Sequence, residues 1–196
     1  EKILNSIYQE CDITKPKAIK IKNLNLNREV DTVIANWYDN VESIINGKGD
    51  NRGIQVYNKD KHNRGDVSFP FLSIARINNR SSLTNGRLKK MIRFVKNVKE
   101  DSDYDIDLNS FEINAICYDI DLDKYKDKSF YELVGVIYHQ LKSITTNSFH
   151  ADRLISVDGT ETIFRGKPEK INELKLILAE IESIYTDLFE IKRAIW

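Results

Sequence analysis

The stretch Thr84-Asn-Gly-Arg-Leu-Lys-Lys-Met-Ile-Arg-Phe-Val-Lys-Asn-Val-Lys-Glu100 decides how the rest of the chain is interpreted. Because successive residues of an α-helix are turned by about 100°, this stretch predicts a helix with an apolar stripe beside a basic stripe. The apolar stripe holds Leu88, Met91, Ile92, Val95 and Val98, and the basic stripe holds Lys89, Arg93 and Lys96. Such a helix can sit in a core and still offer cations to phosphate. An ordinary solvated face is the alternative, and this stretch alone leaves both open.

Length and charge limit the class of protein. The 196 residues suffice for one domain or a compact two-lobed unit with a real core. The 30 Lys and Arg residues balance the 30 Asp and Glu residues, so the formal net charge is zero. Any basic site must therefore be local, and an extended nucleic-acid partner is not expected. The apolar runs are too short to span a bilayer, so no membrane partner is expected either.

Cysteine usage bears on the compartment. Cys11 and Cys117 lie far apart and form no CxxC pair, which favours buried, reduced thiols and a cytoplasmic location. The three histidines show no ligand spacing with the cysteines, so a zinc site is not expected. A helical period over residues 1–11, with no initiator Met before it, suggests a fragment of a larger protein.

The N-terminal third carries the strand pattern. Residues 18–24 and 28–35 alternate between apolar and polar side chains and are joined by a short Asn-rich link, which predicts a hairpin. Residues 53–57 predict a further strand, residues 37–45 fit either a short helix or a strand, and residues 58–66 predict a polar surface loop.

Beyond residue 67 the pattern is almost wholly helical. The predicted helices cover residues 68–76, 84–100, 110–118, 129–144 and 167–195. Thr84 or Asn85 is expected to cap the second helix, and Asn109 or Ser110 the third. Residues 78–85 and 146–166 are expected to be irregular. The fold class is therefore α+β, with strands followed by a mostly helical C-terminal lobe.

Asp31 is the unusual residue of the strand region, because aspartate is disfavoured inside strands. It either faces water, as many strand aspartates do, or is held there for chemistry. The chain has no P-loop, no GxGxxG after a strand, no GxSxG elbow and no HExxH helix. Side chains would therefore have to bind any phosphate. In metal-dependent nucleotidyl transfer, carboxylates hold Mg²⁺ while basic groups hold the triphosphate, but one carboxylate does not complete a two-metal site.

The order of four segments resembles a known family. Val30-Asp-Thr-Val-Ile-Ala-Asn-Trp37 resembles the strand with the third metal-binding carboxylate of the DNA polymerase β-like nucleotidyltransferases. Within them the chain is most similar to the branch of oligoadenylate synthases and bacterial cyclic-oligonucleotide (cyclic GMP-AMP synthase-like) synthases. The other segments are Ser68-Phe-Pro-Phe-Leu72, the helix from Thr84 to Asn97, and Ser110-Phe-Glu-Ile-Asn-Ala-Ile-Cys-Tyr-Asp119. Each motif is weak alone, and their order carries the resemblance.

The resemblance implies roles for particular residues. Asp31 would be the third metal carboxylate, acting as general base or metal-orienting group, with Mg²⁺ as cofactor and ATP or another nucleoside triphosphate as substrate. Lys89, Arg93 and Ser110 would contact the triphosphate, with Lys96 a turn further along. Residues 1–67 would be the distal part of the palm-like catalytic domain, and residues 68–196 the helical lobe, with 84–100 as the spine that joins the lobes.

The family's Gly-Ser turn and first two metal aspartates would lie upstream of residue 1. The chain alone would therefore be inactive, as the C-terminal portion of an enzyme that makes a linear or cyclic oligonucleotide signal, for example in antiphage defence. The alternatives are a non-catalytic module that binds a nucleotide or a protein, and a plain α+β scaffold. At this point Asp31 can still be a water-facing residue, and Ser110 a helix cap.

Overall fold

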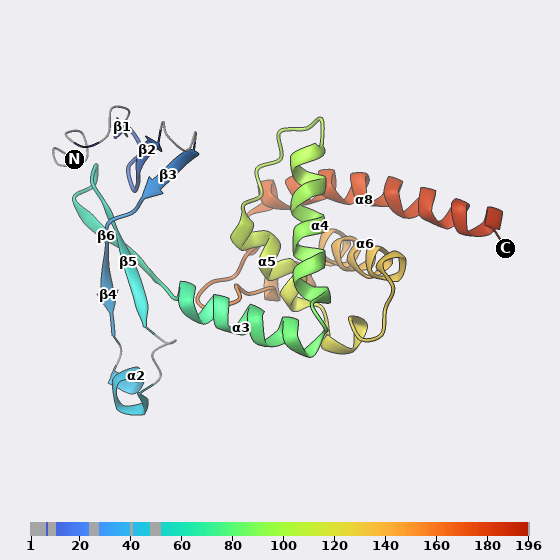
Figure 1. Ribbon diagram of the computed structural model, residues 1–196, viewed down its shortest axis with the longest axis horizontal. Coiled ribbons are helices and arrows are strands. Elements are labelled where there is room, and N and C mark those ends of the chain that lie inside the picture. The colour runs from blue at the N-terminus through green and yellow to red at the C-terminus, as the bar shows by residue number, and fades with distance from the viewer. Residues whose placement is uncertain (1–6, 8–10, 24–27, 40, 48–51, 196) are drawn as a thin grey trace. The chain divides into compact units, whose positions relative to one another are not determined.

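The computed structural model describes residues 7, 11–23, 28–39, 41–47 and 52–195. The chain divides into two compact units, Glu1–Leu72 and Ser73–Trp196. The first contains strands in two small antiparallel sheets and the second is helical (Figure 1), so the predicted α+β fold is confirmed. Helix α3 (Pro70–Leu83) carries the chain from the first unit into the second.

The first sheet contains the predicted hairpin. Its strands, in their order across the sheet, are β1 (Cys11–Asp12), β2 (Ile19–Asn23) and β3 (Arg28–Thr32). Ile19 and Ile21 of β2 are buried, while Lys20 points to the opposite face and pairs with Asp31. Of the helix predicted over residues 1–11, Ile7 is helical, and the prediction is wrong at Cys11, which pairs with Ile21 as a strand. The other positions of this segment lie outside the described residues.

The second sheet begins where the predicted strand 28–35 ends. Its strands, again in order, are β4 (Ala35–Tyr38), β5 (Gly53–Asn58) and β6 (Asn63–Ser68), with helix α2 (Val41–Asn46) between β4 and β5. Strand β6 replaces much of the loop predicted over 58–66. The Asn58 side chain accepts hydrogen bonds from the backbone N–H groups of Asp60 and Lys61, which closes a tight turn and returns the chain alongside β5.

The second unit is a helical core. After α3 come α4 (Arg87–Asp101), α5 (Ser110–Asp119), the 3₁₀ helix η2 (Leu122–Lys124), α6 (Phe130–Thr146), α7 (Ser148–Arg153) and α8 (Pro168–Ile195). The apolar stripe of α4 is buried as predicted, with Leu88, Met91 and Val95 at 0% exposure. It packs with α5, α6 and α8 in one apolar cluster, so this stripe stabilises the helical unit itself.

Two segments predicted to be irregular are helical. Helix α3 continues to Leu83 because Arg76 donates a hydrogen bond to the carbonyl oxygen of Val157 (2.7 Å) and Arg80 donates one to that of Ile120. Helix α7 forms because the Asn147 side chain accepts hydrogen bonds from the N–H groups of Phe149 and His150, the second and third residues of the helix. In both cases polar side chains that suggested a loop are held by backbone groups.

The start of α4 also differs from the prediction. The residue at the N-cap is Gly86, in a left-handed conformation with φ of 80°, and no side chain caps the helix there. Thr84 is buried, and its hydroxyl accepts a hydrogen bond from the N–H of Leu88 while donating to backbone carbonyls of α3. Thr84 therefore links the two helices instead of acting as the N-cap.

Candidate functional site

The basic face of α4 is exposed. Lys89 and Arg93 are exposed and Lys96 is half-buried, and all three lie on one side of the helix. Among the described residues, no hydrogen bond or ion pair to a carboxylate engages Lys89 or Arg93. By contrast, Arg87 donates a hydrogen bond to the carbonyl oxygen of Lys128 (2.9 Å) and has a structural role. Lys89 and Arg93 are thus available to an anion.

Lys96 lies on the side of α4 that faces α5. Burial raises the pKa of the Cys117 thiol on α5 to about 12, and the positive charge of Lys96 acts in the opposite direction. That charge reaches Cys117 because α4 and α5 pack together. The thiol is buried and stays protonated at neutral pH, so it is a core residue and not a nucleophile. The two cysteines form no disulfide.

Ser110 is the first residue of α5 and not its cap. Asn109 is the N-cap, and its side chain accepts hydrogen bonds from the N–H groups of Phe111 (2.9 Å) and Glu112 (3.0 Å). Glu112 completes the capping box by accepting a hydrogen bond from the N–H of Asn109 (2.8 Å). Ser110 is exposed, and its hydroxyl donates to no other described residue. The structure removes the alternative that Ser110 serves as the cap.

Glu112 is a further residue that stabilises the start of this helix, and it was not among the predicted residues. Glu112 is buried, and it forms an ion pair with Lys170 of α8 at 3.4 Å. The spacing Asn109-x-x-Glu112 is itself a capping-box signature and could have identified the pair from sequence. The partner Lys170 has no comparable local signal.

Asp31 lies on β3 at the edge of the first sheet and is exposed. Lys20 is directly opposite on β2, and its ammonium forms a 2.6 Å ion pair with Glu29 on the same face. Asp31 belongs to the first unit, whereas the α4 cations and Ser110 belong to the second. Helices α4 and α5 pack against each other within the second unit, whereas Asp31 belongs to the first.

The described residues alone do not form a metal centre. No group of three or more His, Cys, Asp or Glu side chains in this part of the chain is arranged to hold a metal ion. Asp31 could supply one carboxylate, and a Mg²⁺ ion would need further ligands from elsewhere. Within the same residues, no helix has the length and apolar character that a membrane crossing requires.

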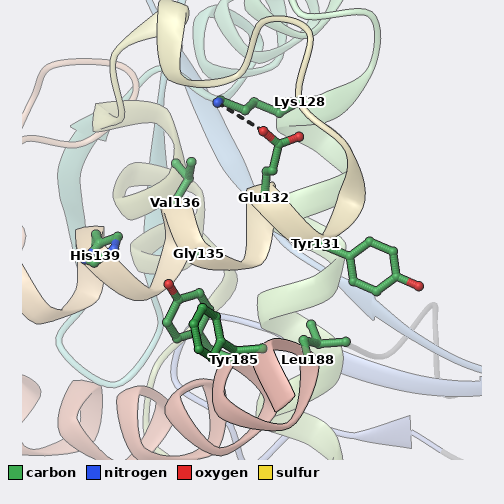
Figure 2. A pocket seen from close by; sticks show the side chains of 9 residues that line it. Lys128, Tyr131, Glu132, Gly135, Val136, His139, Tyr185 and Leu188 are labelled. Atoms are coloured by element: carbon green, nitrogen blue, oxygen red, sulfur yellow. Dashed lines mark hydrogen bonds and ion pairs between the residues drawn. The ribbon is translucent and has the colours of Figure 1, made fainter. Parts of the chain in front are cut away.

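A separate groove of about 380 Å³ lies between α6 and α8. Figure 2 shows the Tyr185 ring against Gly135 and the Lys128–Glu132 ion pair at one end. A Cβ atom at Gly135 would lie 3.0 Å from the Tyr185 ring, so a larger residue there would require that ring to shift. The lining is mostly apolar and includes none of the predicted site residues. This groove is therefore distinct from the basic face of α4.

Comparison with known proteins identifies the family. Residues 75–186 match the cGAS/DncV-like nucleotidyltransferase C-terminal helical domain, which is more than half of the chain. The chain belongs to this family. The resemblance seen in the order of sequence motifs is thereby confirmed.

Three comparisons describe the similarity more closely. A c-di-GMP synthase of Capnocytophaga granulosa is 53% identical over 190 residues, covering 96% of this chain and 54% of the relative. A c-di-GMP synthase of a Lachnospiraceae bacterium is 43% identical over 189 residues, with the same two coverages. The solved structure of the STING-associated CdnE c-di-GMP synthase from C. granulosa superposes with a TM-score of 0.88 at 52% identity, covering 97% of this chain and 61% of that one. The chain spans about half the length of the curated relatives it matches.

Proposed function

We propose that this chain is the C-terminal portion of a nucleotidyltransferase that joins nucleoside triphosphates into a cyclic dinucleotide, and specifically GTP into c-di-GMP. The observation that carries the proposal is the 53% identity to a named c-di-GMP synthase across nearly all of this chain. In this proposal the first unit is the distal part of the catalytic domain and the second is the helical lobe. The product would act as a cytoplasmic signal in antiviral defence.

The cations of α4 would bind the triphosphate of the substrate. Arg93 offers a planar fork of N–H donors, and Lys89 and Lys96 offer ammonium groups, on one side of the helix. Ser110 adds a hydroxyl at the start of α5, where the positive end of the helix dipole also favours phosphate. A hydrogen bond to a charged group contributes about 1.5–3 kcal/mol, so each of these residues should matter measurably.

Asp31 would be one ligand of a catalytic Mg²⁺ ion, whose chemistry is to neutralise phosphate charge and lower the pKa of an attacking hydroxyl. The remaining carboxylates would come from a part of the full-length protein that this chain does not include. Asp31 is exposed on its strand, so its carboxylate is free to serve as a ligand.

The test is an assay of the full-length natural polypeptide with GTP and MgCl₂, with c-di-GMP measured by mass spectrometry. We expect Asp31→Ala to reduce the rate at least about a hundredfold, because a metal ligand contributes several kcal/mol to the transition state. Lys89→Ala and Ser110→Ala should each lower kcat/KM by about tenfold to a hundredfold. Lys175→Met, on the exposed side of α8, is the control and should match the parent protein.

Two experimental results would contradict parts of the proposal. Full activity in Asp31→Ala would end the assignment of Asp31 as a metal ligand. A full-length sequence without a Gly-Ser turn and an Asp-x-Asp pair before residue 1, together with no product from any nucleoside triphosphate, would favour a non-catalytic nucleotide- or protein-binding module. The described residues contain no complete metal site, which is the observation that keeps this second function in view.

A further inference from the structure

Helix α8 holds the loop that precedes α5 through polar side chains on one face. Glu180 accepts a hydrogen bond from the Ser102 hydroxyl (2.9 Å), and Glu173 accepts one from the N–H of Asp107 (2.9 Å). Lys170 donates to the carbonyl oxygen of Asp107 (2.6 Å). Residues 170, 173 and 180 fall on neighbouring positions of the helix surface, so α8 contacts the loop at three points.

Lys170 is the centre of this set of contacts. Its ammonium lies 3.1 Å from the Asp107 carboxylate and 3.4 Å from the Glu112 carboxylate, in addition to the Asp107 carbonyl. Its side chain is 17% exposed and that of Glu112 is 8% exposed. A carboxylate as buried as Glu112 is costly unless a cation and hydrogen bonds compensate it. Lys170 supplies the only cation paired with Glu112 among the described residues.

The charge of Lys170 is maintained at neutral pH. Burial by itself lowers the pKa of this lysine, but the hydrogen bond to Asp107 and the negative charges of Glu112 and Asp107 outweigh it, so the pKa lies above its ordinary value. Lys170 is therefore charged at neutral pH and can form the ion pair with Glu112 there.

The Glu112 carboxylate links Lys170 to the first turn of α5. One carboxylate oxygen pairs with Lys170, and the other accepts the hydrogen bond from the N–H of Asn109. Asn109 in turn caps the N–H groups of Phe111 and Glu112. Ser110 lies between the two partners of this capping box, so its backbone is fixed on both sides.

We propose that Lys170 is a positioning residue for Ser110, which it holds in the orientation that binds the triphosphate of the substrate. The proposal rests on the proposed function. Lys170 acts through Glu112 and Asn109 and does not touch the substrate itself. A hydrogen bond weakens steeply as its geometry departs from the ideal, so the loss of Lys170 should weaken nucleotide binding without removing any group from the site.

The experiment uses the full-length protein, steady-state kinetics with GTP, and GTP dissociation constants. Lys170→Met keeps the aliphatic stem but removes the charge, and we expect it to raise KM and Kd for GTP about tenfold while kcat changes less than about threefold. Lys170→Arg restores the charge and should recover most of the affinity. Lys175 lies on the same helix, is exposed and, among the residues that the structure describes, donates only to Asn172 one turn away, so Lys175→Met should match the parent.

A double-mutant cycle separates positioning from general stability. If Lys170 acts through Ser110, then Lys170→Met should have little further effect on KM in a Ser110→Ala background. Independent, multiplying effects would overturn the proposal, and so would a parent-like KM in Lys170→Met. If Lys170→Met unfolds, the variant Lys170→Met/Glu112→Gln replaces it, because it leaves no unpaired buried carboxylate. A parent-like KM in that variant would equally overturn the proposal.

The outcome also distinguishes this proposal from the proposed function. Parent-like GTP binding and product formation in Ser110→Ala and Lys89→Ala would reject the triphosphate site itself. Loss of binding in those two variants, with parent-like binding in Lys170→Met, would reject only the positioning role of Lys170.

Discussion

The two units of the chain bury their apolar residues to very different extents. In the helical unit, buried side chains from Leu88 to Ile181 form one continuous cluster. In the described part of the first unit, Ile19 and Ile21 are the only buried large apolar side chains. The same unit exposes a set of apolar residues on β3, β4 and α2 and between them: Val30, Val33, Ile34, Trp37, Val41, Ile44 and Ile45.

This difference shows which part of the chain completes its own core. Four helices of the second unit cover one another, whereas the two small sheets of the first unit leave apolar side chains in contact with solvent. Exposed apolar patches of this kind usually mark interaction surfaces. The curated relatives share only about half of their own length with this chain, and we propose that a segment matching the other half covers these exposed side chains, called the patch below, in the full-length protein.

The largest expected effect is a core truncation in the helical unit. Leu141 of α6 is fully buried, and Leu141→Ala should lower the free energy of unfolding by about 3 kcal/mol through lost transfer energy and the cavity left behind. Ile34→Ala is the matched change in the first unit, where Ile34 is 59% exposed in this chain. For this chain alone it should change the free energy by less than about 1 kcal/mol, measured by urea denaturation.

Leu141→Ala and Ile34→Ala in the full-length protein test whether the patch is covered there. If the patch is covered there, Ile34→Ala should become several times more costly than in this chain, while the effect of Leu141→Ala stays similar. An Ile34→Ala effect that remains small in the full-length protein would contradict the expectation that the patch is covered.

Sequence patterns predicted the helical unit better than the sheets. The apolar stripes of α4, α6 and α8 repeat over many residues, and that period directly reflects burial on one side. Strand β6 was missed because Asn63–Ser68 is polar and pairs only after a turn closed by the Asn58 side chain. The end of α3 was missed because its arginines bind carbonyl groups far along the chain.

For the candidate site, the sequence predicted on which helix face its residues lie, and their roles stay predictions. The exposure of Lys89 and Arg93 follows from their spacing against the apolar stripe of α4. The link from Lys170 to Glu112 could not be predicted, because it depends on how α8 packs against the loop before α5. Local patterns indicate which face a residue occupies, but they do not indicate which distant residue it meets.

A smaller loss of stability is expected when a tyrosine hydroxyl is removed from each unit. Tyr125 in the helical unit is fully buried, and its hydroxyl donates a hydrogen bond to the carbonyl oxygen of Cys117 at 2.8 Å. Tyr125→Phe leaves that carbonyl unsatisfied and should cost about 1–2 kcal/mol in the free energy of unfolding. The control is Tyr57→Phe in the first unit, where the hydroxyl meets His62 at 3.3 Å at the surface. It should change stability by less than about 0.5 kcal/mol, and equal losses in the two variants would contradict the difference in burial.

The smallest effect on stability is expected from two glutamates, one in each unit, whose pKa values are lowered for different reasons. In α6 the Glu132 carboxylate accepts hydrogen bonds from the N–H and the hydroxyl of Ser129, which lowers its pKa from the ordinary 4.5 to about 2. In the first sheet the pKa of Glu29 is lowered mainly by its hydrogen bond with Lys20 and by the charge of that lysine. Glu132 depends on a nearby backbone group, whereas Glu29 depends on a flexible cation.

Both carboxylates therefore stabilise the folded state above the unfolded pKa, and this contribution is lost as the pH falls through the folded value. The melting temperature of Glu132→Gln should lie below that of the parent at pH 7, and the gap should narrow between pH 4.5 and about 2. Glu29→Gln should show a smaller gap, which about 1 M NaCl reduces further, while the Glu132 gap persists because its main partner is an uncharged N–H group. A Glu132 gap that disappears in salt would show that Lys128, and not the capping box, holds this carboxylate.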